Sequence, residues 1–374
     1  MCCLAQGVAP ACRHDGTAFS PQDELFRLQP GAPLGCRAAL LQARGDWEWL
    51  CQCFRFRHFS SEMMCFLCDA SWTGPMSFFN VSDHAPHKAT LLTHEQYLAQ
   101  CAQDRATPSA LFSSPGFRLD FVALDSMHCG DLGVFQDAIG SILWLEISNK
   151  QWHSSYAAGL LFLNKELERF YRLNPGKTQL RLVLNMVKPA DGGWPTLKSK
   201  AAECRHLTDF VYIIAQRHKR RQYTFDDPRL HPYSAQYQAT VVDVMESLRG
   251  YHGSCAEANF DAAACRRHMH KFISSYSELR LLFRRNLPEG LHYAQPFNFR
   301  PKAHMLLHIV DQKIDIWGSP REFWCYADED FVGLVKRICV MTRHPANLEN
   351  NVLIKYRLFA ALCCLELERS EREW

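Results

Sequence analysis

Hydrophobic side chains recur at helical spacing along most of the chain after residue 130. Stripes of this kind predict helices over 155–173, 198–219, 233–250 and 260–285, with Gly- and Pro-containing turns between them. A similar stripe over 131–147 predicts one more helix ahead of these four. We therefore expect the middle of the chain to be almost entirely helical.

The first part of the chain has a different pattern. Residues 1–34 contain Gly, Pro and Cys without periodicity, which predicts an irregular segment. Apolar side chains on both faces of 36–43 predict a buried strand, and a helical pattern follows over 47–56. A second strand is expected over 117–124. Asp46 therefore lies at the junction between a strand and a helix.

The end of the chain has two amphipathic segments. His304 and His308 lie four residues apart in an apolar run, so on a helix they share one face. After a break at Gly318, the acidic residues 328–330 precede a second stripe of helical spacing. A terminal helix is expected over 348–368.

Composition and charge limit the class of protein. Hydrophobic residues make up 47% and charged residues 22% of the chain, as in folded soluble proteins. A net charge of +3 is too small to indicate nucleic-acid binding by itself. The 17 cysteines would suggest disulfides in a secreted chain, but no basic n-region or apolar h-region follows Met1. No stretch is long and apolar enough to span a bilayer. We expect an intracellular, reduced protein whose cysteines are mostly small buried hydrophobes.

Two pairs of metal-type ligands stand far apart in the sequence. Cys65-x-x-Cys68 has the spacing of a zinc knuckle, although on its own it is better explained as two buried thiols. His304-x-x-x-His308 resembles half of a metalloprotease helix, but that chemistry needs Glu where Met305 stands. Taken alone, this pair is best explained as packed helix core. Together, two Cys and two His complete a structural zinc set with no position left for water.

Carboxylates stand at points where an element begins or ends. Asp46 and Asp125 follow the two predicted strands, and His128 comes three residues after Asp125. Each residue has an ordinary structural explanation, because Asp46 is a favoured N-cap and Asp125 with His128 could cap the next helix. Glu329 suits the dipole of a helix start. Their order along the chain, together with the Cys and His pairs, is harder to obtain by chance.

Basic residues gather near one predicted helix. The run 217–221 would favour phosphate groups, but it also suits a helix C-terminus for dipole reasons. More basic residues come shortly before it, so this helix offers a candidate nucleic-acid-binding face. The residues are Lys198, Lys200, Arg205, Arg217, Lys219, Arg220 and Arg221.

In this order the motifs resemble a family. Gly45-Asp46, Cys65-x-x-Cys68 and Asp125-x-x-His128 resemble the transposase of CACTA-type (En/Spm, Plavaka) elements. The late block with His304, His308 and then Glu329 resembles the final catalytic segment of the same family. The order is also similar to the catalytic cores of Transib transposases and the V(D)J recombinase, where a Cys pair and a His pair share a zinc ion. The likeness spans roughly 36–345.

The resemblance implies an α/β remnant of an RNase H-like core with a large all-α insertion, in a chain that is predominantly helical overall. It divides the chain into an irregular segment over 1–34 and a partial core with the Cys pair over 35–130. A helical insertion over 131–295 follows. The helical part over 296–374 would then close the core.

The resemblance also implies chemistry. In that family two aspartates and a glutamate hold two divalent ions, Mg²⁺ or Mn²⁺, for phosphodiester cleavage and strand transfer. Asp46 matches the second aspartate and Glu329 the glutamate, and the acids flanking Glu329 are weaker candidates. Asp125 and His128 match a supporting motif. The zinc ion would be structural.

One expected residue is missing. The first catalytic aspartate belongs on a strand well before Asp46, and Asp15, Asp23 and Glu24 lie in no convincing strand. We therefore expect a truncated or decayed transposase derivative, or a fragment whose N-terminal part is supplied elsewhere. Cleavage would be lost or residual.

The expected protein is thus nuclear, binds DNA and lies outside membranes. The sequence is also compatible with a homo-oligomer. One alternative is a non-catalytic, zinc-stabilised nucleic-acid-binding or scaffold protein, which would bind DNA in a salt-sensitive way without cleaving it. Another is an unrelated metalloenzyme that uses His304, His308 and a third ligand such as Asp311 or Glu329. This last alternative needs an open zinc position.

Overall fold

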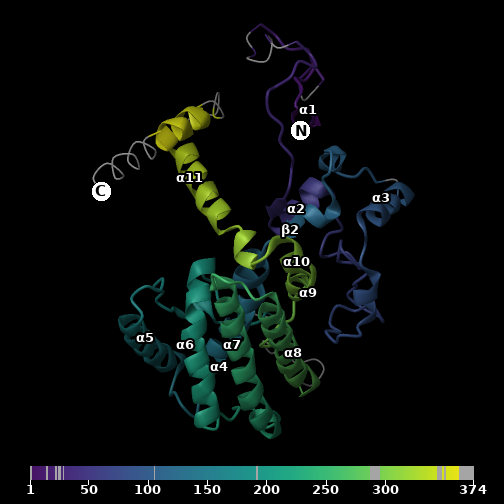
Figure 1. Ribbon diagram of the computed structural model, residues 1–374. Helices are drawn as coiled ribbons and strands as arrows, with labels where there is room; N and C mark the ends of the chain where they lie inside the picture. The colour runs from purple at the N-terminus through teal and green to yellow at the C-terminus, as the bar shows by residue number, and fades with distance from the viewer. Residues whose placement is uncertain are drawn as a thin grey trace. The chain divides into compact units, whose positions relative to one another are not determined.

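Helices make up most of the chain in the computed structural model (Figure 1). It divides into two units, Met1–Trp324 and Cys325–Trp374. The expectation of a predominantly helical chain is confirmed, whereas the RNase H-like core remains a prediction. The structure describes residues 2–13, 16–21, 23, 27, 29–104, 106–190, 193–286, 295–342, 348 and 351–361.

Two short strands form a parallel pair in the first unit. β1 (Ala43–Gly45) pairs with β2 (Val122–Leu124), and Gly45 stands opposite Leu124. The predicted strand over 36–43 is wrong, because strand pairing begins only at Ala43 and Leu41 is 64% exposed. Apolar residues on both faces do not make a strand without a neighbour to pair with. Within the predicted strand over 117–124, only Val122–Leu124 pair with β1, so the observed strand is shorter than predicted.

The loop that carries Cys65 and Cys68 lies between the first two helices after β1. α2 (Trp47–Phe54) buries its apolar face, and α3 (His94–Gln103) begins with a capping box at Thr93. Between these helices, the ring of Phe56 stacks on that of Phe66 with centroids 4.1 Å apart. This stacking fixes the Cys65–Cys68 turn against the core.

The helical middle is confirmed nearly as predicted. An irregular turn of π-type, η5 (Met127–Val134), leads into α4 (Phe135–Ser148), which is buried along most of its length. The predicted helix over 233–250 extends further, because its apolar contacts with α8 continue for another turn and a half. Figure 1 shows α6, α7 and α8 side by side. The bounds are α5 (Tyr156–Leu173), α6 (Ala201–Arg220), α7 (Ser234–Ala256) and α8 (Ala262–Asn286).

The chain then returns to the strands through α9 (Pro301–His308), a π-type turn and α10 (Ile314–Trp317). Every side chain of α9 except Lys302 is buried, so its five apolar residues and both histidines lie in the core. The expected N-terminal segment contains one short helix, α1 (Cys2–Gln6). The remaining short turns are η2 (Pro86–Thr90), η3 (Ala110–Ser113), η4 (Leu119–Phe121), η6 (Leu184–Met186), η7 (His231–Tyr233), η8 (Ile309–Lys313) and η9 (Pro320–Glu322).

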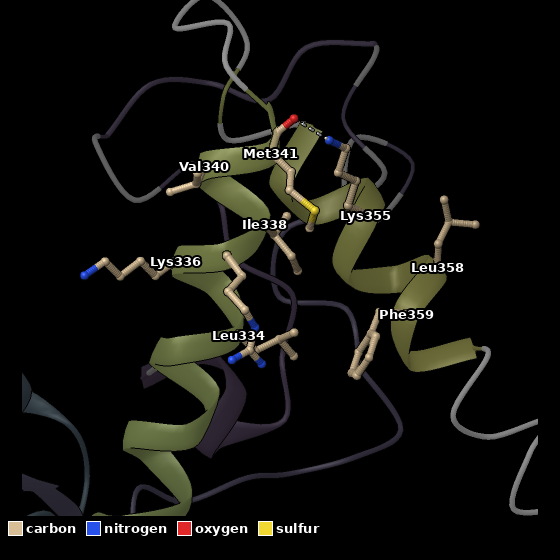
Figure 2. A pocket seen from close by; sticks show the side chains of 9 residues that line it. Leu334, Lys336, Ile338, Val340, Met341, Lys355, Leu358 and Phe359 are labelled. Carbon is tan, nitrogen blue, oxygen red and sulfur yellow. Dashed lines mark hydrogen bonds between the residues drawn. The ribbon is translucent and has the colours of Figure 1, made fainter. Parts of the chain in front are cut away.

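The second unit contains α11 (Tyr326–Thr342) and a helical segment over 351–361. An apolar groove of about 780 Å³ lies between them, lined by Leu334 and Ile338 from α11 and by Phe359 from the other helix (Figure 2). The predicted terminal helix is helical over 351–361, and its remaining part lies outside the described residues. None of the described helices has both the length and the apolar character that crossing a bilayer requires.

Candidate metal centre and acidic strand edge

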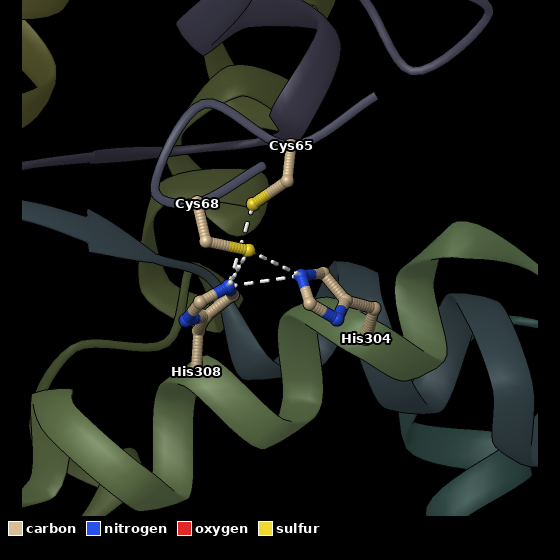
Figure 3. A group of neighbouring side chains, drawn as sticks. All are labelled: Cys65, Cys68, His304 and His308. Carbon is tan, nitrogen blue, oxygen red and sulfur yellow. Dashed lines mark hydrogen bonds between the residues drawn. The ribbon is translucent and has the colours of Figure 1, made fainter. Parts of the chain in front are cut away.

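The two ligand pairs meet in the core of the first unit. His304 and His308 lie one turn apart on α9 and point at the turn that carries Cys65 and Cys68 (Figure 3). All four side chains are buried, and their ligand atoms lie within 4.8 Å of one another. The sequence prediction that these four residues form one cluster is confirmed, and the cluster could hold a metal ion.

The spacing of the ligand atoms fits a tetrahedral ion. Cys65 Sγ lies 3.3 Å from His308 Nε2, Cys68 Sγ lies 3.3 Å from His304 Nε2, and the two Nε2 atoms are 2.9 Å apart. A tetrahedral zinc ion, with bonds of about 2.3 Å to S and about 2.0 Å to N, separates S from N by about 3.5 Å. The same ion separates N from N by about 3.3 Å. Small outward movements of the side chains would therefore complete the coordination sphere.

The protonation states also suit a cation. Burial lowers the pKa of His304 to about 4, so its ring is neutral, as a ligand must be. A hydrogen bond from Cys65 lowers the pKa of Cys68 to about 2 although burial opposes this, and His304 and His308 assist. Burial raises the pKa of Cys65. A divalent metal ion would bind both cysteines as thiolates and so displace their protons.

Neighbouring groups orient the ligands. The backbone N–H of Leu67 donates to Cys65 Sγ at 3.3 Å, and the side-chain amide of Gln312 contacts His308 Nδ1 at 3.0 Å. His304 Nδ1 is buried and meets no hydrogen-bond partner within the described part of the chain. The ring of His87 packs edge-on against His304 with centroids 5.0 Å apart. Sequence reasoning missed both His87 and Gln312, although Gln312 stands four residues after His308.

A second group of predicted residues lies at the carboxyl edge of the two strands. Asp46 follows β1 and Asp125 follows β2, and the register places the two strand ends side by side. Asp125 is buried, and its carboxylate accepts hydrogen bonds from the N–H of Met127 at 2.9 Å and from His128 Nδ1 at 2.5 Å. Asp125 therefore begins the next helical turn and positions the ring of His128.

The charges of Asp46 and Asp125 affect the pKa of His128. Burial works to lower the pKa of His128, but the hydrogen bond from Asp125 and the charges of Asp125 and Asp46 raise it above its ordinary value. Asp46 lines a cavity of about 360 Å³ together with Glu48, Arg300 and Lys302. Lys302 donates to the carbonyl of His128 at 2.8 Å. Asp46 thus presents a carboxylate at a small cleft, close enough to His128 for its charge to raise the pKa of that ring.

The other predicted acid belongs to the second unit. Glu329 lies in the first turn of α11 between Asp328 and Asp330, and all three are exposed. The position suits the helix dipole, as the sequence suggested. Its assignment as a metal ligand stays a prediction.

The predicted basic face is divided by the structure. Arg217 is 8% exposed and lies 3.4 Å from the Glu146 carboxylate, so it belongs to the interior and the expectation that it faces nucleic acid is wrong. Arg205 is half-buried, with its guanidinium 4.7 Å above the ring of Trp324. A helix that turns 100° per residue cannot expose a whole basic run. The exposed members are Lys198, Lys200, Lys219, Arg220 and Arg221.

Comparisons with known proteins give no relative. No family model, no curated protein and no solved structure matches the chain. The site is therefore interpreted from its own geometry.

Proposed function

We propose that this chain is a transposase-derived DNA-binding protein with a structural zinc ion bound by Cys65, Cys68, His304 and His308. Divalent-metal-dependent cleavage of phosphodiester bonds would rely on Asp46 and is at most residual. DNA as the partner and a nuclear location are parts of the same proposal.

The observation that carries the proposal is the convergence of the two ligand pairs. Cys68 and His304 stand 236 residues apart in the sequence, yet their ligand atoms lie 3.3 Å apart. The resemblance to transposases required this convergence, and two unrelated buried pairs would not produce it. The full set of four protein ligands also argues against a zinc enzyme with an open position, and Asp311 instead contacts His270 at 2.6 Å.

The strand edge supports the catalytic part. Two parallel strands ending in Asp46 and Asp125 resemble the arrangement from which an RNase H-like site is built. When bound there, a divalent ion would activate water and stabilise the leaving oxygen. Asp46 would hold the ion, and Asp125 would orient His128 beside it.

Nicking of supercoiled DNA with Mg²⁺ or Mn²⁺ tests the proposal. We expect slow nicking by the wild-type chain, and its loss in Asp46→Asn and Glu329→Gln, because an amide does not replace a carboxylate ligand. Asp104→Asn, which changes an exposed helix-end acid, is the matched control. Nicking that persists in both variants at the wild-type rate would refute the assigned acids.

One observation favours the second candidate function, a non-catalytic zinc-stabilised DNA-binding protein. The Asp125 carboxylate already accepts three hydrogen bonds, from the N–H groups of Met127 and His128 and from the His128 ring. It therefore has little capacity left to replace the missing first aspartate as a ligand of the divalent ion. This candidate predicts DNA binding that weakens with salt, and no nicking with either metal.

A further inference from the structure

A polar cavity of about 390 Å³ opens between α6 and α7. None of its lining residues belongs to the cysteine–histidine cluster. Lys177 reaches it from the loop after α5, and α6 and α7 supply the rest. It is lined by Lys177, Arg205, His206, Thr208, Asp209, Arg249, His252, Gly253 and Ala256. Five of these nine side chains are basic or histidine, and one is acidic.

Contacts inside the cavity hold its cations in place. Asp209 accepts hydrogen bonds from Lys177 Nζ and from Arg249 Nε, both at 2.7 Å. The guanidinium of Arg249 also lies 4.4 Å above the ring of Tyr212, which fixes its plane. The backbone N–H of Thr178 donates to His206 Nδ1 at 2.8 Å, so the proton of a neutral His206 is on Nε2.

Donors outnumber acceptors at this site. Lys177 uses one of its three N–H bonds on Asp209, and Arg249 uses only Nε, so no described residue accepts from the Nη groups of Arg249. His206 Nε2 adds another donor. The nearby acids are already engaged, because Asp131 lies 3.7 Å from Arg205 and 3.3 Å from His252, and Asp209 bridges two cations.

We propose that this cavity binds a phosphoryl group. A phosphoryl group offers three oxygens in three directions, which matches donors that approach from the α5–α6 loop, from α6 and from α7. A planar carboxylate has only two oxygens and would leave donors unmet. Arg249 supplies the planar fork that suits two oxygens, and Lys177 supplies a compact charge. The site needs neither the zinc cluster nor the acidic strand edge, and so it does not depend on the proposed function.

Inorganic phosphate is the first probe, with the full chain. A ligand that binds only the folded state raises its melting temperature as its concentration rises. We expect phosphate to raise the melting temperature more than chloride or acetate at equal ionic strength, and isothermal titration to give one site per chain. A phosphate effect no larger than that of chloride or acetate would overturn the proposal.

Variants locate the site. Arg249→Gln and Lys177→Met each remove one charged donor, and we expect either to weaken phosphate binding by about tenfold or more, as loss of a charge-assisted hydrogen bond does. Arg267→Gln, an exposed change on α8 outside the cavity, should leave it unchanged. Each variant is compared with itself with and without phosphate, so a change in its own stability does not interfere. Equal responses of the cavity variants and of Arg267→Gln would overturn the proposal.

A further arm identifies the source of the phosphoryl group. A 5′-phosphorylated dinucleotide is compared with the same dinucleotide without the 5′-phosphate. Tighter binding of the phosphorylated form than of inorganic phosphate assigns the cavity to nucleic-acid ends. Binding no tighter than inorganic phosphate assigns it to free or small phosphorylated molecules. Binding that does not depend on the 5′-phosphate contradicts a phosphoryl site.

Discussion

Two clusters of buried histidines lie in the first unit, and they differ in where their balancing charge comes from. His218 is fully buried between the Glu146 carboxylate, 2.8 Å from its Nε2, and the Tyr237 hydroxyl, 2.8 Å from its Nδ1. Arg217 adds a cation 3.4 Å from Glu146. The cluster thus contains both an anion and a cation.

The cluster of His304, His308, Cys65 and Cys68 contains no such cation among the described residues. It buries two cysteine side chains and two histidine rings whose ligand atoms face one another, and His304 Nδ1 has no hydrogen-bond partner in the part of the chain that the structure describes. Burying these groups is costly unless something binds them together. The two clusters therefore differ in charge balance: the Glu146 cluster contains its own counter-charges, whereas the cysteine–histidine cluster presents four ligand atoms that could hold a cation.

The largest expected effect comes from removing a ligand. Cys68→Ser should lose the metal and destabilise the first unit by at least about 4 kcal/mol, since structural zinc contributes about 10–16 kcal/mol in zinc fingers. Metal content by mass spectrometry and thermal unfolding check this. Cys36→Ser, at an exposed cysteine, is the control. A full metal equivalent in Cys68→Ser would contradict the account.

A substitution in the cluster around His218 should destabilise the protein without changing its metal content. Glu146→Gln removes the closer of the two carboxylates beside the buried Arg217 and the charged partner of His218, which costs about 3–5 kcal/mol. Denaturant unfolding measures the loss, and Glu166→Gln, a more exposed partner of Arg217, should cost less. A change in metal content would show that the two clusters are not independent.

The same substitution has a pH signature. Burial works to raise the pKa of Glu146, but the hydrogen bond from His218 and the charge of Arg217 hold it below 4.5. Because the folded-state pKa is depressed, the stability that Glu146 contributes is present above pH 4.5. It is lost as the pH falls through the folded-state pKa of Glu146. The difference between wild type and Glu146→Gln should therefore be largest near neutral pH and shrink in acid. A difference that grows in acid would contradict this assignment.

Smaller effects should come from the groups that orient the rings. Gln312→Ala should weaken metal affinity about 10–100-fold, because His308 loses the contact at its Nδ1. Competition with a chelator measures this, and Gln52→Ala, at an exposed position, is the control. Unchanged affinity would mean that Gln312 does not orient the ligand.

Tyr237→Phe is the matched change in the other cluster. It removes the hydroxyl that contacts His218 Nδ1 and should cost about 1 kcal/mol, the value of one ordinary hydrogen bond. Metal affinity should stay at the wild-type value. A loss of affinity here would remove the distinction between the clusters.

The metal cluster could be predicted from the sequence because spacing carries its signal. A turn of Cys-x-x-Cys and a helical repeat of His-x-x-x-His each fix the geometry of two ligands locally. The helices of the middle could be predicted for the same reason, since their apolar stripes have the helical period.

The rest depends on contacts that no local pattern contains. Residues 36–42 were expected in a strand, but only 43–45 have a partner strand to pair with. Arg217 and His218 belong to the basic run that suited a helix C-terminus, yet they continue the buried stripe of Val211 and Ile214. The helical spacing that places both residues on this stripe is present in the sequence, but their basic side chains favoured an exposed position. The cavity that Lys177 and Arg249 share depends on how a loop meets two helices.

X-ray absorption at the zinc edge of the purified full chain tests the central claim most directly. The account predicts one zinc per chain with four ligands, two sulfur atoms at about 2.3 Å and two nitrogen atoms at about 2.0 Å. A chain that purifies without stoichiometric metal, or a coordination sphere without two sulfur atoms, would contradict it.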